Sequence, residues 1–215
     1  MKINDKKTQT VIFNTSTSKD CYPRLINSKG FIYDNTEDFK LLGVDIMTDQ
    51  KQGIRWDSFI RKCIKKAYLN MWILRRLAEF GVSTKDLIMT YIERIRIMVE
   101  PHVALWSFSI NESLVKAIEK VQKVACFIIL GKRSTPSYSR NLSMLNLEPL
   151  ERRREILCKN FASKVFKHPV HNHMFTLTKG QNTRSGSKVV IPPIKHARYR
   201  KSSIPSLAKI INEMK

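Results

Sequence analysis

The chain has 215 residues, 42% of them hydrophobic, so it is long enough and apolar enough to bury a core. It carries 39 Lys and Arg against 18 Asp and Glu, a formal net charge of +21. This composition excludes a chain that is disordered throughout. Phosphate neutralisation is the commonest use of such a positive field, so nucleic acid is expected as a partner before an acidic protein or a membrane.

The positive charge increases along the chain. Residues 1–50 hold seven side chains of each sign, residues 51–131 hold 14 basic and 7 acidic ones, and residues 132–215 hold 18 basic and 4 acidic ones. The first ten residues contain no apolar signal segment, and the longest apolar run, residues 124–130, is too short to cross a bilayer. We therefore expect no membrane partner.

The cysteine pattern indicates reduced thiols. Cys21, Cys63, Cys126 and Cys158 lie far apart and form no CxxC pair. Two of them lie on apolar helix faces, which favours buried thiols in an intracellular protein, nuclear or cytoplasmic, over a disulfide framework.

Residues 1–50 are predicted to form short strands and turns. The segments 22–26 and 31–33 flank the tetrapeptide Asn27-Ser28-Lys29-Gly30, in which Gly suits the positive φ of a tight hairpin. The run Phe39–Ile46 is a further strand candidate, and its central Gly43 indicates a bulge or a close backbone approach. A β-prone run also occurs at residues 10–13.

The stretch from Trp56 to Phe80 predicts a strongly amphipathic helix without Gly or Pro. Its apolar side comprises Trp56, Ile60, Cys63, Ile64, Ala67, Met71, Leu74 and Ala78. Its opposite side carries six cations, Arg61, Lys62, Lys65, Lys66, Arg75 and Arg76. Those cations suit a polyanion, and a merely solvated helix surface is the alternative.

Three more helices follow in the pattern. A capped start at Ser83 precedes an apolar stripe of Leu87, Tyr91, Ile95 and Met98, which ends at Pro101. Asn111 opens a third helix that Gly131 stops, with the apolar positions Leu114, Ile118, Val121, Ala125 and Ile128. Pro149 begins a fourth helix that runs to about Lys167 and ends before Pro169.

These elements predict a mainly α protein of the α+β class, with an antiparallel helical bundle behind a small β-hairpin and strand region and before a flexible basic tail. The expected division is a β region over residues 1–50, a helical domain over residues 51–168, and a basic, largely irregular tail over residues 169–215. Near the end of that tail, residues 204–214 are compatible with one short helix.

The sequence offers little catalytic chemistry. The adjacent pair Glu37-Asp38 stands in a loop-like run, and no Walker A, GxSxG or HExxH motif occurs. The histidines of the segment 168–173, with Cys158, match no standard zinc spacing, so a loop that happens to hold histidines is preferred. No catalytic residue, metal or cofactor is therefore expected. The run Arg152-Arg153-Arg154 is either a phosphate contact or a solvated helix face.

Several of these stretches, taken together, resemble the reverse transcriptases of non-LTR (LINE-like, jockey-like) retrotransposons. The segment 2–13 resembles "N..KT..m.f", which closes the palm after the catalytic aspartates, and residues 39–44 resemble the "F.yLGv" strand at the primer grip. The helix from Trp56 resembles the start of the thumb. Further along the chain the family patterns are matched by Tyr91, Ile95-Arg96, Glu100 and Trp106, by Val121-Gln122-Lys123 and residues 128–131, by Leu145, Leu147, Pro149-Leu150 and Arg152-Arg153, and by Ser202-Ser203-Ile204-Pro205. The departures are Ile97, where the family usually has Pro, and Pro101, where it has Tyr.

The resemblance covers nearly the whole chain in order, and it implies the end of a palm, a thumb and a basic C-terminal region. The family's YxDD-type motif has no counterpart, since no Tyr or Phe followed by x-Asp-Asp occurs. The expectation is a fragment that grips RNA or an RNA/DNA duplex without polymerising, with a missing palm domain or another element-encoded protein as a possible partner. The alternatives are a stand-alone basic nucleic-acid-binding or structural protein, and a decayed reading frame without a selected role. The residues expected to contact nucleic acid are Lys6, Lys7, Arg61, Lys62, Lys65, Lys66, Arg75, Arg76, Arg152 and Arg153.

Overall fold

The structure is a computed structural model, and it describes residues 8, 10–11, 25–26, 30, 32–33, 36, 38–49, 53–177, 188–191, 193 and 197–214. The chain forms two compact units, Met1–Phe59 and Ile60–Lys215, and each is considered by itself below. The boundary between them falls inside the first helix, α1 (Asp57–Glu79). Residues 12 and 13 of the β-prone run at 10–13, together with Lys6 and Lys7, lie outside the described residues.

The first unit contains a three-stranded antiparallel sheet, in the order β1 (Asp38–Leu41), β2 (Val44–Asp49) and β3 (Gly53–Arg55). The prediction of one continuous strand from Phe39 to Ile46 is wrong, because Leu42 and Gly43 form a turn between two strands, with φ values of 49° and 85°. Two successive positive φ values are typical of a tight hairpin turn, which Gly accommodates readily. The turn is hard to predict from the sequence because Leu42 is apolar, and apolar residues are expected in strands. In the structure the Leu42 side chain is 91% exposed.

The earlier hairpin is confirmed at its described positions. Ile26 and Ile32 form an antiparallel bridge, and the Tyr33 amide donates to the Leu25 carbonyl at 2.9 Å. Gly30 has a φ of 79°, the positive value expected for the turn.

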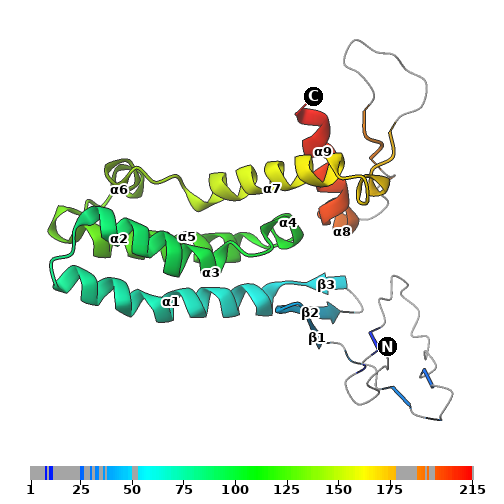
Figure 1. Ribbon diagram of the computed structural model, residues 1–215, viewed down its shortest axis with the longest axis horizontal. Coiled ribbons are helices and arrows are strands. Elements are labelled where there is room, and N and C mark those ends of the chain that lie inside the picture. Colours follow the sequence, from blue (N-terminus) through cyan, green and yellow to red (C-terminus); the bar gives the residue numbers. More distant parts are fainter. Residues whose placement is uncertain are drawn as a thin grey trace. The chain divides into compact units, whose positions relative to one another are not determined.

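The rest of the described chain is mainly helical, which confirms the predicted fold class. Figure 1 shows α1, the segment from α2 to α3, α5 and α7 running alternately in opposite directions, as in an antiparallel bundle. In chain order the elements after α1 are α2 (Thr84–Thr90), the π-helix η2 (Tyr91–Arg96), α3 (Ile97–Val99), α4 (Val103–Trp106), α5 (Glu112–Leu130), the 3-10 turn η3 (Gly131–Arg133), α6 (Tyr138–Leu145), α7 (Leu150–Lys167), the 3-10 turn η4 (Asn172–Met174), α8 (Ala197–Arg200) and α9 (Ser203–Glu213).

The predicted apolar stripes form the core of the bundle. Ala67, Met71 and Leu74 of α1 are fully buried, and Ile118 of α5 is 1% exposed. The predicted caps are also present. The Ser83 hydroxyl accepts from the Asp86 amide, and the Asn111 carbonyl oxygen of the side chain accepts from the Leu114 amide.

One apolar stripe is shifted by a residue from its prediction. Tyr91 and Ile95 are buried as expected, but Val99 is buried in place of Met98. The cause is the π-helix η2, whose wider turn accommodates more residues than an α-helical turn and so delays the return to the buried face. Periodicity at 3.6 residues cannot anticipate that change.

The helix α6 is absent from the sequence-based prediction. Its start is capped by the Ser137 hydroxyl, which accepts from the Arg140 amide, and its end by Asn146 with a φ of 51°. Both residue types are common caps, but the helix has only eight residues and too few turns to produce a clear apolar period.

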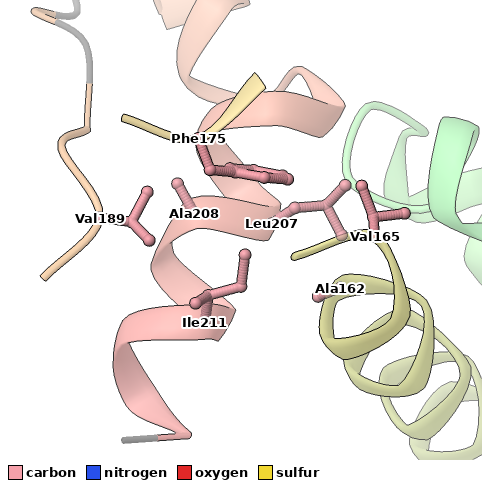
Figure 2. Packing of buried hydrophobic residues seen from close by; sticks show 7 residues of the cluster. All are labelled: Ala162, Val165, Phe175, Val189, Leu207, Ala208 and Ile211. Atoms are coloured by element: carbon pink, nitrogen blue, oxygen red, sulfur yellow. The ribbon is translucent and has the colours of Figure 1, made fainter. Parts of the chain in front are cut away.

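The short helix expected near the end of the chain is present as α9, and it packs against α7. Figure 2 shows Leu207 of α9 beside Val165 of α7, and Ala162, Ala208 and Ile211 belong to the same buried cluster. Two residues outside these helices, Phe175 and Val189, complete the cluster.

The described part of the basic tail therefore contributes to the core, which its composition does not predict. The Asn212 side chain also fixes a backbone segment, since its Oδ1 accepts from the Val189 amide at 2.8 Å and its Nδ2 donates to the Val189 carbonyl at 2.9 Å. Leu177 and Val189 form an antiparallel bridge.

Two leucines of α1 provide a matched test of this core. Leu74 is fully buried, so Leu74→Ala should lower the free energy of unfolding by about 2–5 kcal/mol through lost burial and a residual cavity. Leu69, five residues earlier, is 63% exposed, so Leu69→Ala should change it by about 0.5 kcal/mol or less. Urea denaturation followed by circular dichroism measures both, and equal losses would contradict the placement of this stripe.

Candidate nucleic-acid interface

The exposed side of α1 carries the six predicted cations. Arg61, Lys62, Lys65, Lys66, Arg75 and Arg76 are all exposed, as the periodicity predicts. Arg76 pairs with Glu79 at 2.9 Å, with both side chains more than 60% exposed. In the described part of the chain, no acidic side chain pairs with Arg61, Lys65, Lys66 or Arg75. These four cations are therefore available to an external polyanion.

Two apolar side chains on the same helix were not part of the predicted site. Trp72 is 61% exposed and Leu69 is 63% exposed. Trp72 lies seven residues after Lys65 and four before Arg76, which places all three along one side of the helix. An exposed indole between cations offers a flat surface for stacking beside phosphate contacts. Trp72 could have been identified from the sequence, because it is an aromatic residue at a helical position outside the apolar stripe of α1.

The run Arg152–Arg154 does not act as one surface, because helical geometry sends its three side chains in different directions. Arg152 is exposed and pairs with Glu148 at 3.5 Å. Arg154 is 5% exposed, and its Nη1 has no hydrogen-bond partner among the described residues. Burial lowers the pKa of Arg154. Of the three, Arg152 is the most exposed, and it is paired with Glu148.

Arg153 is half-buried and is held by a carboxylate. Its Nε donates to Glu100 Oε1 and its Nη2 donates to Glu100 Oε2 at 3.3 Å. Arg96 contacts the same carboxylate, with its Nε 3.3 Å from Glu100 Oε1. The hydrogen bond to Glu100 raises the pKa of Arg153. Arg153 thus bridges α7 and the end of α3, and its contact with phosphate stays a prediction.

A second internal polar network surrounds Gln122, which is 1% exposed. The Tyr91 hydroxyl donates to Gln122 Oε1 at 2.5 Å, and Gln122 Nε2 donates to the Tyr138 hydroxyl at 3.1 Å and to the Glu148 carbonyl at 2.8 Å. The Tyr138 hydroxyl in turn donates to Glu119 Oε1 at 2.5 Å. Burial raises the pKa of Tyr91 and of Tyr138, so both phenols stay protonated at neutral pH.

The acidic and histidine candidates do not assemble into a metal centre within the described residues. No group of three His, Cys, Asp or Glu side chains there is placed to hold an ion. Asp45 lies opposite Lys40 in the ladder between β1 and β2, and Glu37 is outside the described residues. The rings of His168 and His171 stack with centroids 4.7 Å apart.

Two thiols behave as predicted, since Cys126 and Cys158 are free and buried, whereas Cys63 is half-buried. Burial raises the pKa of the Cys126 thiol to about 11, so it remains protonated at neutral pH.

Comparison of the chain with models of protein families, with curated proteins and with solved structures finds no match. No helix among the described residues combines the length and the apolar composition that a membrane span requires.

Tyr91 provides a test of the buried network. Tyr91→Phe leaves Gln122 Oε1 without its donor, so the free energy of unfolding should fall by about 1–3 kcal/mol at pH 7. The raised pKa of Tyr91 gives a stabilising contribution that is complete below about pH 10 and declines as the pH rises, because only the unfolded state then ionises readily. The variant should therefore show a shallower alkaline loss of stability.

Urea denaturation at pH 7 and at about pH 10.5 measures both effects. Tyr199→Phe is the control, since Tyr199 is 39% exposed. Identical losses in the two variants would mean that the Tyr91 hydroxyl contributes nothing specific.

Proposed function

We propose that this chain is the C-terminal part of a non-LTR retrotransposon reverse transcriptase and that it binds a template-primer duplex without polymerising. The observation that carries the binding proposal is the exposed face of α1, with Arg61, Lys65, Lys66 and Arg75 all lacking an acidic partner in the described chain. Each cation that neutralises a phosphate releases a counterion from the nucleic acid, which favours association.

The structural roles of the family-like residues support the first part of the proposal. Tyr91 and Gln122 are joined by a buried hydrogen bond, although 31 residues separate them. Glu100 and Arg153 are joined by an ion pair across 53 residues. Residues that match a single ordered pattern therefore depend on one another in space, which isolated chance matches have no reason to do.

The second part of the proposal concerns catalysis. Nucleotide addition by a polymerase uses carboxylates that hold two cations about 3.5–4 Å apart. The sequence lacks the Tyr/Phe-x-Asp-Asp element that supplies these carboxylates in the proposed family. Cationic side chains such as those of α1 can position a duplex, but they cannot replace the metal-binding carboxylates. Binding without primer extension is the activity that follows.

The α1 face is tested by a charge-matched pair of variants. Arg61→Ala/Lys65→Ala removes two of the available cations, so it should weaken duplex binding and reduce the magnitude of the slope of log K against log salt by about 1.8, since each phosphate contact contributes about 0.9. Lys164→Ala/Lys167→Ala on α7 removes the same charge elsewhere and should leave that slope nearly unchanged. Fluorescence anisotropy with a labelled RNA/DNA duplex at several salt concentrations provides the measurement.

Circular dichroism of both double variants establishes that each one folds. Equal weakening by the two pairs would show that net charge alone governs binding, and it would remove the assignment to α1. Equal binding of duplex and single strand by the α1 face would favour the alternative of a nucleic-acid-coating protein.

Catalysis is tested directly on the whole chain. With Mg²⁺ or Mn²⁺, an RNA template, an annealed DNA primer and all four deoxynucleotides, no extension above background is expected, because nothing in the sequence matches the family's metal-binding pair. Gel electrophoresis of the labelled primer measures the outcome. Asp45 and Asp49 are the two carboxylates of β2, so template-dependent extension that is lost in Asp45→Asn would reveal a metal site there and overturn this part of the proposal.

A further inference from the structure

A groove on α5, beside the start of α6, has a composition distinct from the α1 face. It is open to solvent and has a volume of about 500 Å³, within the range of small-ligand sites. It is lined by Lys116, Glu119, Lys120, Lys123, Val124, Phe127 and Tyr138. Cations and aromatic rings therefore share one concave surface, and no part of the duplex-binding proposal uses it.

The cations of the groove form a straight row. Lys116, Lys120 and Lys123 are spaced by four and three residues, so they follow one side of α5. Lys116 pairs with Glu112 at 2.6 Å, and that pair is about three-quarters exposed. In the described chain no acidic side chain pairs with Lys120 or Lys123. Two ammonium groups are thus available to successive phosphates.

The same row ends on an aromatic ring. Phe127 lies four residues after Lys123 and is 38% exposed, although a Phe side chain gains from full burial. Tyr138 lines the groove from α6, and its hydroxyl is held by Glu119 and Gln122, which fixes the orientation of its ring. The groove therefore has a preorganised apolar part.

The carboxylate in the groove is already engaged. Glu119 Oε1 accepts from the Tyr138 hydroxyl and, at 3.1 Å, from the Leu150 amide, and its Oε2 accepts from the Glu151 amide at 3.2 Å. These amides belong to the first turn of α7, where the helix dipole favours a negative charge. The Glu119 carboxylate therefore repels an incoming phosphate less than a carboxylate without these hydrogen bonds would.

We propose that this groove binds unpaired nucleotides of a single-stranded nucleic acid, with a base against Phe127 and the flanking phosphates at Lys120 and Lys123. In a duplex the base faces are stacked on one another, whereas in a single strand they are open to an aromatic side chain. Rows of cations that end on an aromatic ring suit such a strand. The site lies on α5, so single strands and duplexes use separate surfaces of the chain.

The test uses the full chain and a short single-stranded DNA that contains 2-aminopurine, whose fluorescence falls when the base stacks. Lys120→Ala/Lys123→Ala should weaken single-strand binding and reduce the magnitude of its salt slope by about 1.4, since each contact contributes about 0.7. Phe127→Leu keeps an apolar side chain but removes the ring. It should weaken binding by about 5-fold or more and abolish the fluorescence change.

Three controls separate this site from the α1 face and from a lipid surface. Phe161→Leu on α7 replaces a ring with similar exposure, 40%, and should leave single-strand binding unchanged. Duplex binding should be unchanged in the groove variants and weakened in Arg61→Ala/Lys65→Ala. Vesicles rich in phosphatidylserine should bind the groove variants as well as they bind the parent chain.

The proposal is overturned if Phe127→Leu leaves both the affinity and the fluorescence change intact. It is also overturned if the lysine variant weakens duplex and single-strand binding equally, or if only vesicle binding falls. Circular dichroism of each variant excludes unfolding as the cause of a loss. If the parent chain binds single strands but not duplexes, the result counts against the α1 proposal and not against the groove.

Discussion

The buried side chain of Gln122 is the constraint on which the arrangement of the helices depends. The side-chain amide of Gln122 makes three hydrogen bonds within the protein. It accepts from the Tyr91 hydroxyl and donates to the Tyr138 hydroxyl and to the Glu148 carbonyl. These partners belong to η2, to α6 and to the segment before α7, so one amide joins three regions to α5. A hydrocarbon at position 122 could fill the volume, but it would leave several buried polar groups without partners.

The network also explains why the candidate surfaces lie where they do. Tyr138 is held by Gln122 and by Glu119, and Glu119 caps the first turn of α7 through the amides of Leu150 and Glu151. These contacts fix the first turn of α7, and Ala162 and Val165 near the other end of the same helix pack in the cluster with α9 (Figure 2). The polar contacts near α5 and the apolar cluster at α9 therefore lie at the two ends of one helix, α7.

The long helices could be predicted because burial imposes a period on their sequences. The stripe that contains Met71 and Leu74 is an example, and the exposure of the opposite cations follows from the same geometry. What could not be predicted depends on contacts between distant residues or on local turns. The pairing of Arg153 with Glu100 is invisible in a local pattern, and the turn at Leu42 places an apolar residue where turns usually have polar ones. The groove beside Phe127 could not be predicted because it depends on the position of α6, and this helix is too short to give a clear apolar period in the sequence.

The π-helix η2 carries a consequence for how the length of this chain can vary. A π-helical turn is equivalent to an α-helix with one residue added, and here the addition is accommodated between two fixed points, the Tyr91 hydroxyl bond and the buried Val99. Deleting a single residue in the span 92–94 would convert the turn to regular α-helix and keep both points in register. The same deletion in the middle of α5 would rotate half of a buried face into water. Tolerance to insertions and deletions, which is usually a property of loops, should thus extend to this one position inside the bundle.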